Sequence, residues 1–392
     1  MSSSVACTLL LGSLPILASS ALPHGGDGRP IAAVPFDVRA PGAYFLTGDI
    51  APCGAPYGIR VLADDVIIDL GGFVLEGGPA SGPGIFAEGE RRDIVVRNGR
   101  VAHWGGDGIA LSAVEDVELR EVSLYDNGGH GAHLGDRSRI TACTSDLNHG
   151  GRGILTGAGA TIAGCTARGN EYGGIFTGAG STLLECRAEE NLYGSGLEAG
   201  PEAVLRGCEV EGNRESGIRV GAGSLVTGCS ARANLSVGIE VGGETIVRAC
   251  RVSETVDGNG ISIGPGGWVE DCEVRDNRRR GLDLFADAIA RGCTVSGNGQ
   301  AGVRARRGCR LIKNTSESNR GAGIELIGPG VTVDGNVLGS NAADDLVAPG
   351  SGHFVVRNTL DEERAVVGQG SFVAPFRARE DPERGPWDNL RP

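Results

Sequence analysis

A short repeat through the middle of the chain restricts its fold more than any other feature. Eight cysteines recur at intervals of 21 or 22 residues. An asparagine follows five residues after each of them, except that Thr255 follows Cys250. A repeat this short buries an apolar face only by stacking on its neighbours, so the sequence predicts a solenoid. The eight cysteines are Cys143, Cys165, Cys186, Cys208, Cys229, Cys250, Cys272 and Cys293.

Two kinds of solenoid have repeats near this length. A leucine-rich repeat needs leucine at fixed offsets and usually a helical return, but leucine is sparse here and no segment keeps a 3.6-residue apolar period. Short alternating runs, such as 160–163 and 224–227, are typical of brief strands. Glycines, 68 in all, and asparagines are expected to supply the positive-φ corners. The predicted fold is therefore all-β, a parallel β-helix with coils about 4.8 Å apart.

Stacking gives the cysteine column and the asparagine column a structural interpretation. The asparagines should turn inward and hydrogen-bond one another along the solenoid. The cysteine column continues as Asn314, Asn336 and Asn358, which indicates a column of small core residues. Stacked positions keep their Cβ atoms farther apart than a disulfide prefers, and no Cys-x-x-Cys spacing is present, so we expect free buried thiols.

The segments 64–73 and 93–99, together with these columns, resemble the right-handed parallel β-helix proteins of the pectate-lyase-like superfamily. The resemblance covers about residues 57–358. It implies a right-handed coil but no single activity, since that superfamily includes lyases, hydrolases, epimerases, adhesins and non-catalytic members. In its lyases, an arginine often abstracts a proton beside a carboxylate held by Ca²⁺.

Outside the repeat, composition suggests the organisation of the chain. Residues 1–21 have the apolar run and small-residue end of a secretory signal peptide, which predicts a secreted, periplasmic or cell-surface protein. Residues 22–40 are expected to be a lead-in, 41–120 an N-terminal cap with irregular first coils, 121–360 the regular coils, and 361–392 a C-terminal tail or cap. The net charge of −13 argues against a nucleic-acid partner, and no later segment is long and apolar enough to span a membrane.

The residue after each glycine–aliphatic pair should point outward, and this column alternates in charge along its later coils. Opposite charges on adjacent strands usually only stabilise a sheet, although a polar groove for a chain-like ligand is the functional interpretation. Two further arginine groups lie on neighbouring coils and could meet an anionic partner, with a solvated corner as the alternative. They are Arg278, Arg279 and Arg280, followed by Arg304, Arg306 and Arg307.

The N-terminal coils hold the candidate site. Four of the six histidines and several aromatic residues fall at equivalent corners or strand starts. Aromatic platforms beside imidazoles and carboxylates suit a saccharide. Tyr172 and Tyr193 should stack, because each lies two positions after an asparagine of the column. The predicted substrate-binding residues are His103, Trp104, His133, Tyr172, Phe176 and Tyr193.

For catalysis, His130 or His149 could act as a general base, with Asp107 or Asp126 as partner or acid. Arg152 is the one arginine placed to match the lyase role that the resemblance implies. No compact carboxylate set indicates a metal site, so no cofactor is assigned, and Ca²⁺ is left open. We therefore expect a monomeric, exported protein that binds a polysaccharide or cell-surface glycan, with its degradation or modification left open. The alternative is a non-catalytic structural or adhesive surface protein, with the solenoid as a rigid rod.

Overall fold

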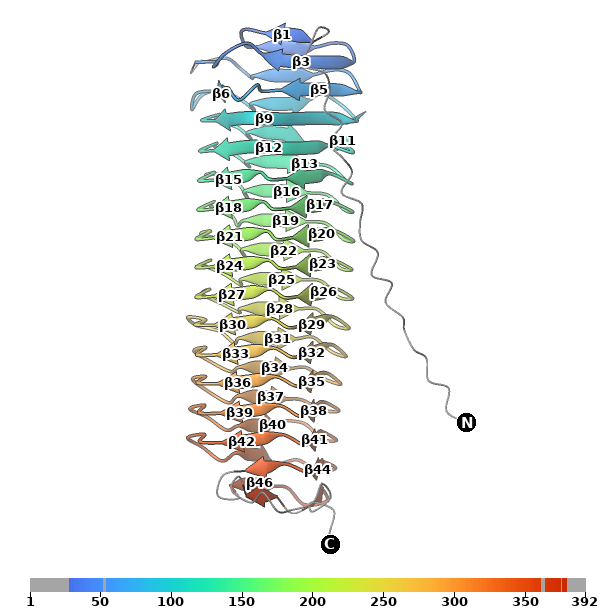
Figure 1. Cartoon of the computed structure of the whole chain (residues 1–392), viewed down its shortest axis with the longest axis vertical. Helices are drawn as coiled ribbons and strands as arrows, with labels where there is room; N and C mark the ends of the chain where they lie inside the picture. Colours follow the sequence, from blue (N-terminus) through green and yellow to red (C-terminus); the bar gives the residue numbers. More distant parts are fainter. Residues whose placement is uncertain (1–27, 52–53, 361–363, 375, 379–392) are drawn as a thin grey trace, which may run out of the picture.

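The computed structural model describes residues 28–51, 54–360, 364–374 and 376–378. Within these residues the secondary structure consists of strands, and they wind into one continuous stack of parallel coils (Figure 1). The predicted parallel β-helix is confirmed. Residues 1–21, which the sequence predicts to be a signal peptide, lie outside the described residues.

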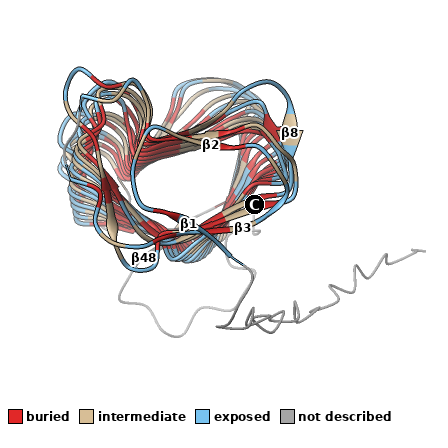
Figure 2. Cartoon of the chain, turned by 90° about the horizontal axis from the view of Figure 1, so that it is seen from above, coloured by how far each residue is buried: buried red, intermediate tan, exposed pale blue. Residues whose placement is uncertain are grey.

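A typical coil contains three strands of three residues each. β16 (Ile154–Thr156) belongs to one sheet, and β17 (Thr161–Ala163) and β18 (Thr166–Arg168) belong to another. Each strand pairs in parallel with its equivalents on the neighbouring coils. Figure 2, seen along the axis, shows the buried residues lining the inside of the coils and the exposed ones outside.

The sheet that carries the candidate site, here called the groove sheet, contains 16 strands. In spatial order they are β2 (Phe36–Val38), β4 (Ile59–Val61), β7 (Ile85–Ala87), β10 (Ile109–Leu111), β13 (Ala132–Leu134), β16, β19 (Ile175–Thr177), β22 (Leu197–Ala199), β25 (Ile218–Val220), β28 (Ile239–Val241), β31 (Ile261–Ile263), β34 (Leu282–Leu284), β37 (Val303–Ala305), β40 (Ile324–Leu326), β43 (Leu346–Ala348) and β46 (Ala365–Val367).

The other large sheet has 30 strands in two columns that share the long early strands. The early strands are β1 (Arg29–Ile31), β3 (Gly42–Leu46), β5 (Val66–Asp69), β6 (Val74–Glu76), β9 (Ile94–Ala102) and β12 (Glu118–Tyr125). The first column continues as β14 (Arg139–Thr141), β17, β20 (Thr182–Leu184), β23 (Val204–Arg206), β26 (Leu225–Thr227), β29 (Ile246–Arg248), β32 (Trp268–Glu270), β35 (Ile289–Arg291), β38 (Arg310–Ile312), β41 (Thr332–Asp334), β44 (Phe354–Val356) and β47 (Phe372–Val373). The second continues as β15 (Thr144–Asp146), β18, β21 (Arg187–Glu189), β24 (Glu209–Glu211), β27 (Ser230–Arg232), β30 (Arg251–Ser253), β33 (Glu273–Arg275), β36 (Thr294–Ser296), β39 (Thr315–Glu317), β42 (Val337–Gly339), β45 (Thr359–Leu360) and β48 (Arg377–Ala378). A small ribbon pairs β8 (Arg91–Arg92) with β11 (Val114–Glu115).

Strands begin earlier in the chain than the composition suggests. β1 and β2 lie inside the segment expected to be a lead-in, and they already pair with β3 and β4. At the other end, β46 pairs with β43 beyond residue 360. The coiled part is therefore longer at both ends than the regular repeat.

Both polar columns lie in the core, as the sequence predicts. The side-chain amide of Asn170 donates to the Oδ1 atom of Asn191 over 3.1 Å, and the same bond joins Asn191 to Asn213 over 2.8 Å. The backbone N–H of each residue donates to the same oxygen, so one amide satisfies several buried groups. The eight column cysteines and Cys309 are buried, free thiols.

The positive-φ corners differ from expectation. The residue before each ladder asparagine adopts the left-handed conformation, and only some of these residues are glycine: Asp126, Glu190 and Ala233 have φ of 53°, 54° and 52°. The ladder asparagines do not occupy these corners. Since parallel stacking repeats the same corner in every coil, tertiary hydrogen bonds impose it on ordinary residues at a modest local cost.

Candidate functional site

The groove sheet presents one outward residue per coil, as the sequence predicts. Consecutive strands align these residues in register, and from Ala110 to Val347 each lies between two buried neighbours. From the N-terminal side the column reads Asp37, Arg60, Phe86, Ala110, His133, Leu155, Phe176, Glu198, Arg219, Glu240, Ser262, Asp283, Arg304, Glu325, Val347 and Val366.

Four predicted or neighbouring residues form a chain of contacts at the corner before this sheet. The Nδ1 atom of His103 lies 2.8 Å from Glu76 Oε1, and its Nε2 atom lies 3.4 Å from Asp126 Oδ2. The other oxygen of Asp126 lies 2.6 Å from the Nε2 atom of His149. We call Glu76, His103, Asp126 and His149 the corner cluster. Glu76 was not predicted, because it lies in an early coil outside the regular repeat.

A second group lies at the start of the groove-sheet strands on the same coils. The Oδ1 atom of Asp107 accepts the backbone N–H of His130 over 2.7 Å, and its Oδ2 atom lies 3.8 Å from His133 Nδ1. The rings of His130 and His133 are 5.1 Å apart. Together with Arg152, these three residues form the strand cluster. The structure thus brings all four predicted residues together on adjacent coils.

The hydrogen bonds of His130 decide which of its nitrogens faces a ligand. Its Nδ1 atom accepts the backbone N–H of Arg152 over 2.9 Å, so the neutral ring carries its proton on Nε2. Burial lowers the pKa of His130 below its usual value of 6.5, against an opposing effect of the Asp107 charge. A neutral ring with Nδ1 occupied can donate from Nε2 but cannot accept a proton there. His130 is therefore suited to binding, not to general-base catalysis.

His149 has the opposite arrangement. A carboxylate only accepts, so the contact with Asp126 places the proton of neutral His149 on Nε2 and leaves the lone pair on Nδ1. None of the described residues forms a hydrogen bond with that Nδ1 atom. A histidine oriented by a carboxylate, with its other nitrogen open, has the geometry of a general base. Of the two histidines predicted for this role, the geometry favours His149.

Arg152 bridges two coils. Its Nη1 atom donates to Glu198 Oε2 over 2.9 Å, and its guanidinium lies 4.3 Å from the centre of the Phe176 ring. The cation therefore already covers one face of Phe176, an arrangement with favourable cation–π contact. A sugar could stack on that face of the ring only if Arg152 moved. The contact with Glu198 was not predicted, because it skips one coil and joins residues 46 positions apart.

The two predicted tyrosines are the exposed aromatic part of the site. Tyr172 is 49% exposed and Tyr193 is 63% exposed, and their ring centres are 6.1 Å apart with a 45° tilt. The backbone N–H of Tyr172 bonds to the carbonyl of Gly151 on the preceding coil. Gly151 lies between His149 and Arg152 in the sequence, so the tyrosine pair adjoins both clusters.

The prediction that Trp104 contacts a ligand is wrong. Its side chain is 1% exposed, and its indole N–H donates to the carbonyl of Leu75 over 3.1 Å. Glycines make this inward position possible: a Cβ atom on Gly58, Gly77 or Gly84 would lie within 2.9 Å of the indole ring. Trp104 therefore fills the core of an early coil, where the regular repeat does not yet apply.

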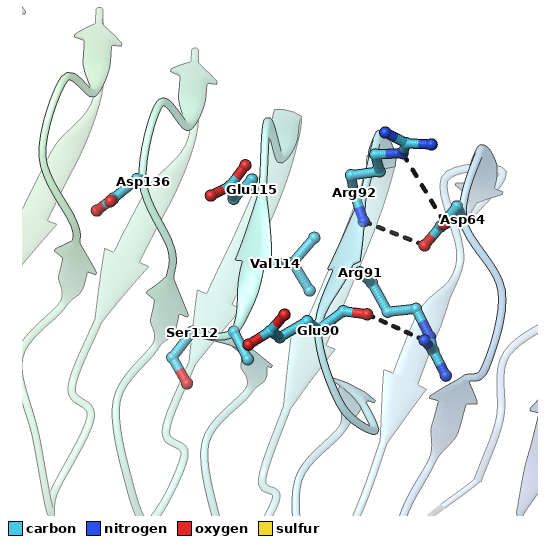
Figure 3. Close-up of a pocket in the computed structure, with 9 residues that line it drawn as sticks. Asp64, Glu90, Arg91, Arg92, Ser112, Val114, Glu115 and Asp136 are labelled. Atoms are coloured by element: carbon cyan, nitrogen blue, oxygen red, sulfur yellow. Dashed lines mark hydrogen bonds and ion pairs between the residues drawn. The ribbon is translucent and has the colours of Figure 1, made fainter.

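A surface pocket of about 460 Å³ lies elsewhere, beyond the opposite ends of the groove-sheet strands (Figure 3). Among its lining residues, the backbone N–H of Arg92 donates to Asp64 and the guanidinium of Arg91 donates to the carbonyl of Glu90. None of its lining residues is aromatic, so it lacks an apolar platform for a sugar ring. They are Asp64, Glu90, Arg91, Arg92, Ser112, Ala113, Val114, Glu115 and Asp136.

Neither cluster has the arrangement of a metal centre. Among the described residues, no group of three or more His, Cys, Asp or Glu side chains is arranged to hold a metal ion. In the corner cluster, the imidazole of His103 separates the carboxylates of Glu76 and Asp126, whereas Ca²⁺ needs several oxygen ligands around one point.

The family comparison agrees with this architecture. The family model described as "Right handed beta helix region" matches residues 83–225 and 155–289, which together exceed half of the chain. The protein belongs to the right-handed β-helix family, and the expected handedness is confirmed. No curated protein sequence matches the chain. The described residues include no helix long and apolar enough to cross a membrane.

Solved structures with a similar fold belong to proteins of different kinds. Pectate lyase Pel9A is 15% identical, with a TM-score of 0.44 over 60% of this chain and 70% of its own. The A-module of the Azotobacter vinelandii mannuronan C-5 epimerase AlgE4 is 16% identical, with a TM-score of 0.45 over 75% and 91%. The pre-mature bacteriophage phi29 gene product 12 is 12% identical, with a TM-score of 0.44 over 87% and 53%. At these identities the likeness concerns the fold alone.

Proposed function

We propose that the protein binds an extracellular polysaccharide on its N-terminal coils, across the tyrosine pair, the strand cluster and the corner cluster. The observation that carries the proposal is the exposed pair Tyr172 and Tyr193, 6.1 Å apart and joined through Gly151 to the coil of His149 and Arg152. Two neighbouring rings on successive coils offer apolar contact area to sugar rings along the axis of the rod.

Polar groups of both kinds flank these rings. Nε2 of His130 offers a donor, whereas Asp107 and the corner carboxylates offer acceptors. Sugar hydroxyl groups need both donors and acceptors around an apolar platform. A site spread over several successive coils is better suited to a chain-like ligand than to a small molecule.

A glycan-array screen of the mature protein, run with and without Ca²⁺, tests the proposal. We expect binding to at least one polysaccharide, and we expect the Tyr172→Ala/Tyr193→Ala variant to lose it by tenfold or more. Trp268→Ala is the matched control, because Trp268 is a similarly exposed ring (44%) on β32 of the other sheet. The control should bind like the natural protein.

The same screen decides between the proposal and its alternative. Binding that survives the double tyrosine substitution would contradict the proposed site. Binding to none of the glycans in either condition would favour a structural or adhesive surface protein, in which the solenoid acts as a rigid rod.

Modification of the bound glycan is a separate question that the geometry makes testable. If a bound glycan is turned over, we propose His149 as the base and Asp126 as the residue that orients it. His149→Ala should then abolish turnover but leave binding within a few-fold, whereas His130→Gln should weaken binding. The reverse pattern would contradict these roles.

A further inference from the structure

A second charged site lies on the groove sheet far from the tyrosines. β34, β37 and β40 are consecutive strands whose outward residues are Asp283, Arg304 and Glu325. β34 is seven strands from β13 in the sheet, so this site is roughly 34 Å along the rod from His133. Arg280 and Arg306 flank it before β34 and after β37. The side chains are well covered, with exposures of 6% for Asp283 and 19% for Arg304.

Two of the arginines are held rigidly around one carboxylate. Arg304 donates from Nε and Nη2 to the two oxygens of Asp283 over 3.0 and 2.7 Å, a bidentate pair. Arg306 donates from Nη1 to Asp283 Oδ1 over 2.8 Å, and its guanidinium lies 3.8 Å from the centre of the Phe285 ring. These contacts occupy both carboxylate oxygens of Asp283 and fix both guanidinium planes.

Arg280 lacks an equivalent partner. Its Nε atom is buried and makes no hydrogen bond with any described residue, and the Oε2 atom of Glu325 lies 3.9 Å away from it. Burial lowers the pKa of Arg280, and the positive charge of Arg304 lowers it further. An arginine does not lose its proton in a protein, so the group remains a cation with an unsatisfied donor.

The charges do not balance. Three guanidinium groups surround one buried carboxylate, and Glu325 is at the margin. Arg304 Nη1, two nitrogens of Arg306 and the whole fork of Arg280 form no hydrogen bond with a described acceptor. A buried donor such as Arg280 Nε is normally satisfied by an acceptor, and planar guanidinium forks match oxyanions well.

We propose that Arg280, Arg304 and Arg306 form a binding site for an oxyanion, such as a sulfate, phosphate or carboxylate group. The site holds a single such group near Arg280, and Asp283 is the pedestal that keeps the other two arginines in place. The group can belong to a glycan that extends along the groove sheet or to a free anion. The proposal is independent of glycan binding at the tyrosine pair, since no residue is shared.

Thermal unfolding in different anions tests the site. Sodium sulfate, phosphate and acetate are compared with chloride at equal ionic strength, because sulfate stabilises most proteins by exclusion from their surface. The readout is therefore the difference between variants. We expect these anions to raise the unfolding midpoint of the natural protein more than that of Arg280→Met. The apparent affinity of the natural protein for the anion should be at least tenfold higher. Arg280→Lys, which keeps the charge but not the fork, should be intermediate.

Arg279→Met is the matched control, because Arg279 lies on the same loop but is exposed and contacts Asp257 at 3.3 Å. It should respond to each anion like the natural protein. Equal responses of the natural protein, Arg279→Met and Arg280→Met would overturn the proposal.

Binding of dextran sulfate, polygalacturonate and neutral dextran then identifies the source of the oxyanion group. Binding of a charged polymer that depends on Arg280 assigns the group to a glycan, and a response to small anions alone assigns it to a free oxyanion. The Tyr172→Ala/Tyr193→Ala protein should keep its anion response, which separates this site from the proposed glycan site.

Discussion

The Nδ1 atom of His130 accepts the backbone N–H of Arg152 over 2.9 Å, and this bond separates the roles of the histidines on the N-terminal coils. It leaves His130 with a donor at Nε2. His149, bonded through Nε2 to Asp126, keeps a free lone pair at Nδ1. Two residues that look equivalent in sequence thus offer a ligand opposite hydrogen-bonding properties.

His130 should titrate below its usual pKa of 6.5, because burial disfavours its charged form. The unfolded chain then binds more protons than the folded one, so stability rises with pH across this window. The contribution of neutral His130 to stability is fully present above about pH 6.5 and is lost as the pH falls through the folded pKa. NMR titration of the ring protons measures the pKa of His130, and the His130→Gln variant assigns its signal. A pKa above 6.5 would contradict the burial of His130.

His353 provides an internal comparison for that experiment. Its side chain is almost fully buried, and desolvation lowers its pKa as well. The slope of the unfolding midpoint against pH should therefore decrease in His130→Gln but persist until His353 is also replaced. Complete loss of the slope in His130→Gln alone would show that His353 does not contribute.

Thr255→Asn should stabilise the protein. Thr255 interrupts the asparagine ladder, and its buried Oγ1 atom has no hydrogen-bond partner among the described residues. An asparagine there could accept from the backbone of Asn234 and donate to Asn277, as the other rungs do. We expect about 1–2 kcal/mol of added stability, the net value of one or two buried hydrogen bonds. Chemical unfolding measures it.

The matched control for the ladder is Asn191→Thr, which creates the same interruption in an intact part. Its amide accepts from Asn170 and donates to Asn213. We expect a loss of about 2 kcal/mol or more, because buried partners are left unsatisfied. Unchanged stability in both variants would mean that the ladder does not stabilise the fold.

The column cysteines should resist modification until the protein unfolds. All eight and Cys309 are buried free thiols, and burial raises the pKa of Cys309. Alkylation followed by site-resolved mass spectrometry should label none of these nine in the native state and all of them in denaturant. Rapid native labelling of Cys208, at the middle of the column, would contradict a closed core.

Asp37 should make the first coils sensitive to acid. Hydrogen bonds from Arg60 lower the pKa of Asp37 from 3.8 to about 2, with a further bond from Tyr57. The folded carboxyl is the stronger acid, so its contribution is present above about 3.8 and is lost as the pH falls towards 2. The midpoint difference between the natural protein and Asp37→Asn should shrink over this range. Glu88→Gln, which removes a more exposed partner of Arg60, is the control.

Much of the fold follows from the period alone. Parallel coils align equal positions, so the spacing of Cys143, Cys165 and their successors was sufficient to predict the buried thiols and the asparagine ladder. Alternation within a three-residue strand was sufficient to predict the outward column of the groove sheet, including Asp283, Arg304 and Glu325. These properties are local and repeat identically, which is why one sequence pattern determines them.

The tertiary structure decided which outward side chains meet and which nitrogen or oxygen they present. Arg152 passes over Phe176 to Glu198, His103 contacts Glu76 in an irregular coil, and Trp104 turns inward because three glycines leave room for it. Long side chains reach across more than one coil, and the early coils depart from the 21- or 22-residue spacing. Position in the repeat therefore predicts a residue's face, whereas its partner depends on packing against neighbouring coils that no single repeat encodes.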